Sequence, residues 1–216
     1  LVSTSADRTA RVWDMQRRNA AGGLRTGPAI RVLERSGSGC YAARFSPDGL
    51  LIAAADGGSV RLWDAATGRL VRELSASDKG RVFSVAFSPA DNRMLAVGYG
   101  GQIDLSHVVL WDIDTGMELA RLTGATDLPD FPLDDEYSGA VGALDFSPDG
   151  KHLVAGFGSP NLFSPAREPT PLKVWEVASR RLIRRLSGHQ GYCVALDFSP
   201  DGSLLASGSR DGTAIL

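Results

Sequence analysis

The chain has 216 residues, a formal net charge of −2, 43% hydrophobic residues and 22% charged residues. This is the composition of a globular protein, and it excludes a wholly disordered chain because there is enough apolar material for a core. The near-neutral charge gives no electrostatic footprint for nucleic acid or for an anionic membrane. The longest wholly apolar run, 50–55, is far too short to cross a bilayer. No secretory signal follows Leu1, so we expect a soluble, cytoplasmic protein.

An internal repeat runs through the whole sequence. Phe-Ser-Pro occurs four times, beginning at Phe45, Phe87, Phe146 and Phe198, and Asp-Gly follows in every copy except the one at Phe87. A tryptophan followed by an acid also occurs four times, at Trp13, Trp63, Trp111 and Trp175. The phenylalanines are separated by 42, 59 and 52 residues, and the tryptophans by 50, 48 and 64. A unit of roughly 40–45 residues with this punctuation is typical of one four-stranded propeller blade.

Each unit predicts four strands in chain order. The first is β-prone and ends in the Ser-Pro-Asp-Gly turn, as in 82–87, and proline and glycine suit a hairpin there. The second is apolar with small residues, as in 204–208, and the third ends at the tryptophan, as in 60–63. After the turn 64–68, the fourth strand, 69–74, carries charged residues that suit an exposed outer edge. Helical periodicity is absent.

These motifs resemble the WD-repeat β-propeller family over essentially the whole chain. The resemblance implies an all-β fold whose blades each have four antiparallel strands, lettered a to d. It places strands b to d of a first blade at 1–33, full blades at 39–75, 81–123 and 140–187, and strands a to c of a fifth at 191–216. Because rings of this family usually have about seven blades, we expect an incomplete ring that is part of a larger propeller. Such a part exposes apolar blade faces and unpaired strands, so we predict that the isolated chain self-associates or precipitates.

The resemblance also implies a structural brace in each blade. Its members are a histidine before strand a, a serine or threonine on strand b, an aspartate in the b–c turn and the strand-c tryptophan. The brace residues that match are His189, Ser207 (or Ser209) and Asp211 in the last blade, Asp7 and Trp13 in the first, and Trp63, Trp111 and Trp175 between them. His189, Asp211 and a serine also have the composition of a hydrolase triad. A buried network that satisfies polar groups is the favoured interpretation.

The remaining motifs predict no catalytic residue, no metal site and no cofactor. Asp112-x-Asp114-x-Gly116 has some character of a calcium loop, but the aligned 64–68 has a single acid, so we expect a turn. Cys40 and Cys193 occupy a position that other repeats fill with valine, which predicts buried, reduced thiols. No phosphate-binding loop, His-Glu-x-x-His or Gly-x-Ser-x-Gly is present.

Three connections are longer than the bare repeat requires. The segment 124–139 mixes five acids with aromatic residues, 158–171 is rich in proline, and 99–107 is lengthened more modestly. In the family, d–a and b–c connections emerge on one rim, so we expect these three on one face and the insertion 20–29 on the opposite face. Long loops in compact domains are functional, disordered or simply tolerated. The candidate partner-binding residues are Tyr99, His107, Asp127, Asp130, Phe131, Asp134, Asp135, Glu136, Tyr137 and Phe163.

These features predict a non-catalytic scaffold or recognition module for protein–protein interaction. Its partner would be a protein or a peptide, and a basic one is the natural ligand for an acidic loop. One alternative is a sensory or regulatory domain of a larger signalling protein. A second is a propeller enzyme that uses acids in its central channel. Residues matched at the channel-facing position are Arg44, Ala86, Asp145 and Asp197.

Overall fold

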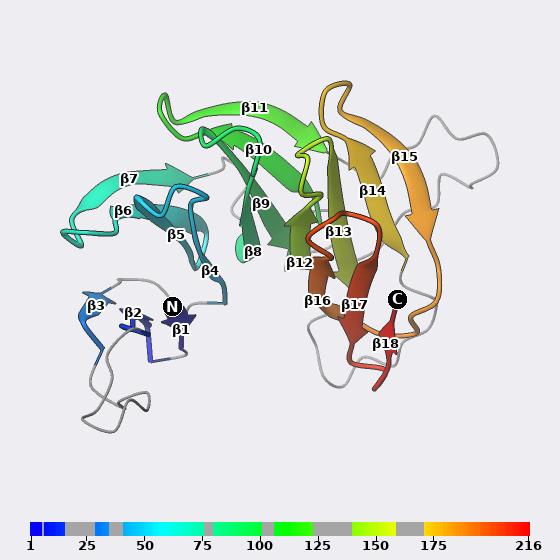
Figure 1. Cartoon of the computed structure of the whole chain (residues 1–216), viewed down its shortest axis with the longest axis horizontal. Helices are drawn as coiled ribbons and strands as arrows, with labels where there is room; N and C mark the ends of the chain where they lie inside the picture. Colours follow the sequence, from blue (N-terminus) through cyan, green and yellow to red (C-terminus); the bar gives the residue numbers. More distant parts are fainter. Residues whose placement is uncertain are drawn as a thin grey trace.

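In a computed structural model of the chain, five antiparallel blades stand side by side in chain order around an open centre (Figure 1). The structure describes residues 1–5, 7–15, 29–34, 41–75, 80–100, 106–122, 140–158 and 171–216. Every regular element among these residues is a strand, which confirms the predicted all-β propeller and its incomplete ring. No helix in the described part of the chain is long and apolar enough to cross a membrane.

The first two blades contain seven strands. Blade 1 consists of β1 (Val2–Thr4), β2 (Thr9–Val12) and β3 (Arg31–Glu34). Blade 2 consists of β4 (Ala43–Phe45), β5 (Leu51–Asp56), β6 (Ser59–Asp64) and β7 (Leu70–Ser75). Each is a meander in which every strand pairs with the next one along the chain. Strands β1, β2 and β3 of blade 1 therefore correspond to strands b, c and d, which in blade 2 are β5, β6 and β7.

The other three blades contain eleven strands. Blade 3 consists of β8 (Arg81–Phe87), β9 (Met94–Gly100), β10 (Val108–Asp112) and β11 (Met117–Leu122). Blade 4 consists of β12 (Ala140–Phe146), β13 (His152–Gly158), β14 (Leu172–Glu176) and β15 (Arg181–Leu186). Blade 5 consists of β16 (Cys193–Phe198), β17 (Leu205–Ser209) and β18 (Ala214–Ile215). Blades 3 and 4 are further joined by a β9–β12 pairing, Gly100 with Ala140.

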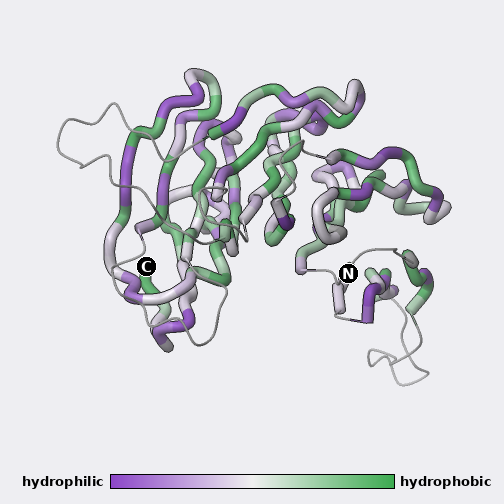
Figure 2. Tube along the Cα trace, turned by 180° about the vertical axis from the view of Figure 1, so that it is seen from behind, coloured by the Kyte–Doolittle hydropathy of each residue, from purple (hydrophilic) through white to green (hydrophobic). Residues whose placement is uncertain are grey.

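The hydrophobic core lies between the blades. Separate buried clusters fill the interfaces of blades 1 and 2, 2 and 3, 3 and 4, and 4 and 5. The inner strands β9 and β13 are buried along nearly their whole length. The outer strands carry the polar residues, seen as purple segments along β11 and β15 in Figure 2. Blade-to-blade packing therefore holds the arc together.

The acid that follows each tryptophan organises the turn between strands c and d. In blade 2, one oxygen of Asp64 accepts hydrogen bonds from the amide and the hydroxyl of Thr67, both at 2.6 Å. In blade 3, Asp112 accepts from the amides of Asp114 (3.0 Å) and Thr115 (2.8 Å). Backbone amides thus occupy the carboxylate that a calcium loop would need. The Trp-acid motif is explained by the turn that it closes.

Candidate functional site

The three long connections start and end at one edge of blades 3 and 4. Ala140, the first residue of β12, pairs with Gly158 at the end of β13 and with Gly100 at the end of β9. In blade 3, Val108 begins β10 and pairs with Leu122, the last residue of β11. The strand register therefore gathers the bases of the β9–β10, β11–β12 and β13–β14 connections, which we call the insertion edge.

Two residues predicted to contact a partner are buried instead. The exposed fractions of Tyr99 and His107 are 0% and 5%, and their rings stack with centroids 5.2 Å apart. Strand β9 runs past the expected turn to Gly100, so Tyr99 is still a strand residue and packs inside the sheet. The prediction for these two side chains is therefore wrong. They form the interior base of the insertion edge.

Arg121 on the outer strand β11 links His107 to Glu118 at the insertion edge. Nη1 of Arg121 on β11 lies 3.1 Å from Nε2 of His107, and Nε of Arg121 is 3.1 Å from Oε1 of Glu118. A guanidinium can only donate, so Nε2 of His107 must be the acceptor and the ring is neutral in this arrangement. The insertion edge thus rests on fixed side chains.

The other candidate contact residues lie outside the described residues. They are Asp127, Asp130, Phe131, Asp134, Asp135, Glu136, Tyr137 and Phe163. Next to the base of the β13–β14 connection, Lys173 is buried and its ammonium lies 4.6 Å from the centre of the Phe157 ring. A cation over an aromatic face adds to the rigidity of this base.

A cavity of about 290 Å³ lies on the axis of the arc, bounded by the innermost strand of every blade. Among the residues that line it, Arg44 alone has a charged side chain. The rings of Tyr41 and Phe83 pack there in a tilted arrangement, with centroids 5.1 Å apart. The channel acids of the enzyme alternative do not line it. Oδ2 of Asp145 accepts a hydrogen bond from the amide of Phe198 (2.9 Å), which ties β12 to β16.

The environment of Asp145 is that of a structural acid. Partial burial raises the pKa of this carboxyl, the nearby charge of Asp197 adds to the rise, and the Phe198 amide opposes it. A raised pKa in a channel is compatible with proton transfer. In the described residues, however, one of its oxygens is engaged by the backbone of the next blade. The arrangement explains Asp145 as a link between blades.

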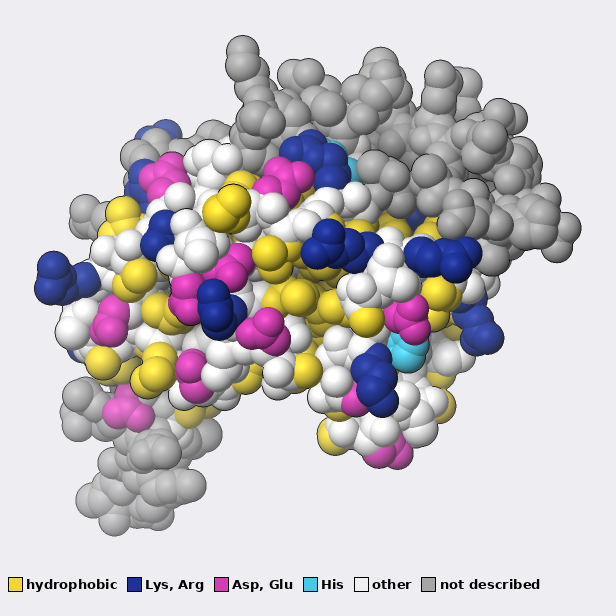
Figure 3. Space-filling model, turned by 90° about the horizontal axis from the view of Figure 1, so that it is seen from above, with side chains coloured by type: hydrophobic (Ala, Val, Ile, Leu, Met, Phe, Trp, Pro, Cys, Tyr) yellow, Lys and Arg dark blue, Asp and Glu magenta, His cyan; other side chains and the backbone are white. Residues whose placement is uncertain are grey.

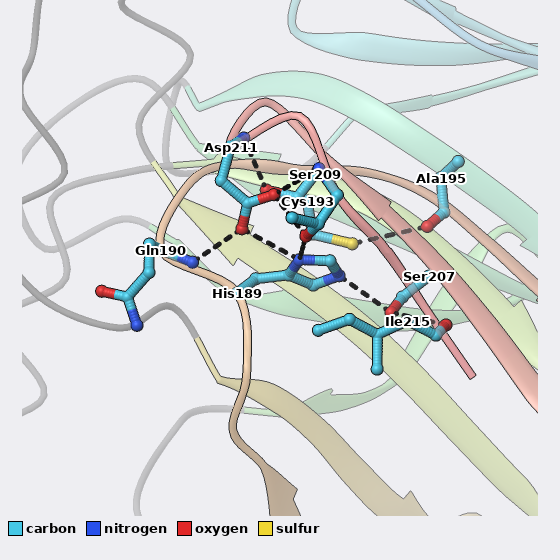
Figure 4. Close-up of polar contacts among 9 residues, drawn as sticks. His189, Gln190, Cys193, Ala195, Ser207, Ser209, Asp211 and Ile215 are labelled. Carbon is cyan, nitrogen blue, oxygen red and sulfur yellow. Dashed lines mark hydrogen bonds and ion pairs between the residues drawn. The ribbon is translucent and has the colours of Figure 1, made fainter.

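The brace of blade 5 is assembled around His189 (Figure 4). Nδ1 of this buried ring lies 3.1 Å from Oδ2 of Asp211 and 3.1 Å from the hydroxyl of Thr213, and Nε2 lies 2.9 Å from the hydroxyl of Ser207. Asp211 also accepts from the amide of Gln190 (2.8 Å). Ser207 is thus the brace serine.

This geometry has the order of a hydrolase triad but not its accessibility. His189 and Ser207 are both buried, at 2% and 6% exposed, so no substrate carbonyl can approach the hydroxyl. The hydrogen bond from the Thr213 hydroxyl is the main reason that the pKa of Asp211 lies well below its usual value, with smaller contributions from Gln190 and His189. The network satisfies buried polar groups and fixes the 189–213 region.

Blade 1 has a related brace without a histidine. Asp7 accepts from the hydroxyl of Thr9 (2.6 Å) and from Nη2 of Arg11 (2.9 Å). The indole of Trp13 donates to the hydroxyl of Ser3 at 2.8 Å. Thr9 and Ser3 were not predicted, nor was Thr213. The sequence did contain a signal for these hydroxyl residues. Residues 1–12 align with 205–216, so that Ser3, Asp7 and Thr9 are equivalent to Ser207, Asp211 and Thr213.

The tryptophans of the middle blades are core residues. Trp63, Trp111 and Trp175 are all buried, each in the cluster between its own blade and the previous one. The strand-b residues at the position of Ser3 are Ala54, Val97 and Ala155, as the β-pairing register shows. No hydroxyl is available there, so apolar packing replaces the brace in these blades.

Comparison with known proteins agrees with this architecture. The family model described as "WD domain, G-beta repeat" (WD40) matches residues 27–64, 133–159 and 180–216. The β-propeller domain of Cps50 (Swd1) from Myceliophteria thermophila is similar in structure, with a TM-score of 0.70 and 19% sequence identity. The similarity covers 97% of this chain and 60% of that one, and it concerns the fold alone.

Several curated proteins are similar in sequence. The nuclear distribution protein nudF of Aspergillus niger is 26% identical over 220 residues, which is 99% of this chain and 45% of nudF. The small ribosomal subunit protein RACK1y of rice (Oryza sativa subsp. japonica) is 51% identical over 45 residues, 21% of this chain and 13% of that protein. The WD repeat-containing protein VIP3 of Arabidopsis thaliana is 32% identical over 137 residues, 57% of this chain and 38% of VIP3. The chain thus spans less than half the length of each of these relatives.

Proposed function

Because this chain belongs to the WD-repeat β-propeller family, we propose that it is a non-catalytic platform for protein binding whose partners dock at the insertion edge. Members of this family typically serve as scaffolds for protein interaction. The observation that supports the site is the strand register, which gathers the bases of three long connections over two adjacent blades.

The chemistry of the β11–β12 connection favours a basic partner. Residues 123–139 contain five acids, two aromatic side chains and no lysine or arginine. Acids steer a basic partner toward the site and aromatic rings can anchor it. Elsewhere the outer rim shows acidic and basic side chains interspersed, without a field of one sign (Figure 3). The excess of negative charge is therefore a local property of this connection.

The fixed base lowers the cost of binding. Burial of Tyr99 and His107, together with the Arg121 contact, holds the start of the edge in one arrangement. Less conformational entropy is then lost when a partner orders the loops.

Replacement of Pro129–Tyr137 by a short Gly-Ser turn tests the proposal. The probe is a lysine- and arginine-rich peptide of about 12 residues, titrated against the chain by fluorescence anisotropy. We expect the replacement to weaken binding by at least about tenfold, and the affinity of the unaltered chain to fall as salt rises. The matched control replaces residues 20–29, the insertion between strands c and d of blade 1, and should leave binding unchanged.

Two outcomes would contradict the proposal. Equal affinity of the unaltered chain and the 129–137 replacement would remove the acidic connection as the binding site. Binding that is lost equally in both replacements would assign the effect to general charge or folding instead of the insertion edge. Circular dichroism of both variants monitors the fold.

A further inference from the structure

At two blade interfaces, an arginine of the outer strand crosses the rim to the next blade. Arg31 on β3 donates to two carbonyls of the β6–β7 turn, and Arg72 on β7 donates to two carbonyls of the β10–β11 turn. In each turn a glycine, Gly68 or Gly116, lies directly beside the arginine side chain. An arginine therefore bridges the rim between blades 1 and 2 and between blades 2 and 3.

The interface of blades 3 and 4 differs at both of these positions. Ala120 on β11 occupies the register position of Arg72. In the β14–β15 turn, Arg180 with φ 62° replaces the glycine. A Cβ at Gly116 would lie 2.7 Å from Nη1 of Arg72, so the Cβ of Arg180 takes the place that a bridging guanidinium would need. The third rim thus has neither the arginine nor the space for its cationic head.

Apolar side chains remain half-exposed at this third rim. Four of them pack against the core between blades 3 and 4, and we call them the rim patch: Met94, Leu119, Ala120 and Val177. The equivalent of Val177 in the bridged turn of blade 3 is Ile113, which is only 5% exposed. Figure 3 looks onto the rim and shows yellow apolar side chains gathered near the middle of the view. Blades 3 and 4 are complete four-stranded blades with a neighbour on each side, so the rim patch is independent of the ends of the arc.

The charges beside the rim patch are compensated on blade 3 but not on blade 4. On blade 3, Arg93 pairs with Asp112 at 3.0 Å and with Asp114 at 2.9 Å. On blade 4, the exposed Arg180 and Arg181 follow each other at the end of the β14–β15 turn. Within the described part of the chain, the Arg180 side chain has no carboxylate at ion-pair distance. The blade 4 side of the rim patch therefore offers positive charge to a partner.

We propose that the rim patch is a docking surface for an acidic segment of a partner protein, in which an apolar side chain lies next to an aspartate or glutamate. The apolar side chain packs on Leu119 and Ala120, where the other rims have the stem of an arginine, and the carboxylate pairs with Arg180. A basic anchor does not fit, because Arg180 fills the guanidinium position and repels a second cation.

This surface is distinct from the insertion edge. Met94 and Val177 lie at the ends of β9 and β14 opposite to that edge. The chemistry of the partner is also opposite, since the acidic connection favours a basic one. Docking at the rim patch therefore goes beyond the proposed function and can hold or fail independently of it.

Rebuilding the arginine bridge tests the proposal. Ala120→Arg/Arg180→Gly gives the third rim the arginine and the turn glycine of the other two and leaves the net charge unchanged. The probe is a displayed library of random peptides of about 12 residues, selected on the unaltered chain. We expect the selected peptides to place leucine, methionine or phenylalanine next to aspartate or glutamate. Their affinity, measured by fluorescence anisotropy, should fall at least about tenfold in the rebuilt variant.

A single substitution separates charge from shape. Arg180→Gly keeps the fold, because glycine readily adopts the positive φ of this exposed position. It should weaken binding of the selected peptides by about two- to fivefold and reduce the salt dependence of their affinity. Arg69→Ala, which removes an exposed arginine from the equivalent part of blade 2, is the control matched in charge and should bind as the unaltered chain does.

Three outcomes would overturn the proposal. They are a library that yields no binder, selected peptides that lack acids, and equal affinity of these peptides for the unaltered chain and both Arg180 variants. Urea denaturation of each variant shows whether a loss of binding reflects unfolding. The lysine- and arginine-rich peptide should bind the rebuilt variant as it binds the unaltered chain, so failure at the rim patch is distinguishable from failure at the insertion edge.

Discussion

The indole N–H of the strand-c tryptophan is satisfied in one blade and unsatisfied in another. Trp13 donates to Ser3 at 2.8 Å. In blade 3, the equivalent of Ser3 is Val97, and Nε1 of Trp111 is buried with no hydrogen-bond partner in the described part of the chain. A buried donor without an acceptor costs about 1–3 kcal/mol. Blade 3 therefore carries a local defect that a single hydroxyl could correct.

Val97→Thr should place an acceptor beside Trp111 while nearly conserving side-chain volume. We expect the free energy of unfolding to rise by up to about 1 kcal/mol, because the new hydroxyl pairs with the orphan N–H. Urea denaturation measures the change. Val60→Thr is the control, since Val60 is also fully buried but has no equivalent donor beside it; it should destabilise by about 1–3 kcal/mol. Equal destabilisation by both variants would contradict the explanation.

Asp211 should make the stability of the chain depend on pH in the acid range. Its pKa in the folded state is depressed, chiefly by the Thr213 hydroxyl, so ionised Asp211 favours the folded state. That contribution is complete above the unfolded pKa of about 3.9 and is lost as the pH falls below it. Asp211→Asn should lower the thermal midpoint at pH 7, and the difference from the unaltered chain should shrink below about pH 4.

Thermal melts between pH 3 and pH 7 check this expectation. Asp114→Asn is a suitable control, because the Asp114 carboxylate is exposed on a turn, where it pairs with Arg93 at 2.9 Å. Exposed ion pairs contribute little to stability. A difference between the Asp211 variant and the unaltered chain that stays constant down to pH 3 would show that the carboxylate charge is unimportant.

At the scale of elements, arginines on outer strands fasten one blade to the next. Arg31 on β3 donates to the carbonyls of Ala66 and Thr67 in the β6–β7 turn. Arg72, at the same register position on β7, donates to the carbonyls of Asp114 (2.7 Å) and Thr115 (3.2 Å) in the β10–β11 turn. We call this contact the arginine clamp.

The clamp is absent between blades 3 and 4, and the turn sequence changes with it. The register position of Arg72 is occupied by Ala120 on β11. The β14–β15 turn has Arg180, at φ 62°, where the clamped β10–β11 turn has Gly116, at φ 75°. A Cβ at position 116 would lie 2.7 Å from Nη1 of Arg72, whereas the clamp position facing the β14–β15 turn is the short side chain of Ala120. Loss of the arginine at position 120 therefore removes the steric reason for a glycine at position 180.

Gly116→Ala tests the clamp. Its Cβ would lie 2.7 Å from Nη1 of Arg72, in addition to the strain of a positive φ. Gly49→Ala is the matched control, because Gly49 has φ 74° and open space around its Cβ, so it should cost about 1–2 kcal/mol from the backbone alone. We expect Gly116→Ala to cost more than the control.

Removal of the arginine should abolish this excess. In an Arg72→Ala background, Gly116→Ala should cost no more than Gly49→Ala, and the double-mutant cycle measured by urea denaturation gives the coupling. Additive costs would show that Arg72 and the turn are energetically independent.

The blade pattern was predictable because its signals are local. Phe-Ser-Pro-Asp-Gly and Trp-acid each encode a turn through side-chain hydrogen bonds a few residues away, as Asp64 and Thr67 illustrate. The clamp was not predictable, since Arg72 and Thr115 are 43 residues apart and meet only through blade packing. The error at Tyr99 has the same origin. How far β9 extends depends on its pairing with β8 and β12, which the sequence of the loop does not specify.

At the scale of the whole molecule, the principal strand contacts of the described residues join each blade to its immediate neighbours. In such repeat architectures, stability is approximately a sum of unit and interface contributions. Blades 2, 3 and 4 have two interfaces each, and β9–β12 pairing joins blades 3 and 4 into a continuous sheet. Blades 1 and 5 have one interface each within the chain. The ends of the arc should therefore open more readily than its middle.

Amide hydrogen exchange should report this order directly. At low concentration, we expect the slowest exchange in β9 and β13, which are buried and paired on both sides, and the fastest in β1–β3 and β18. Sub-denaturing urea should speed exchange at the ends first, because their opening exposes the least surface. Uniform protection across all five blades would instead indicate one cooperative unit.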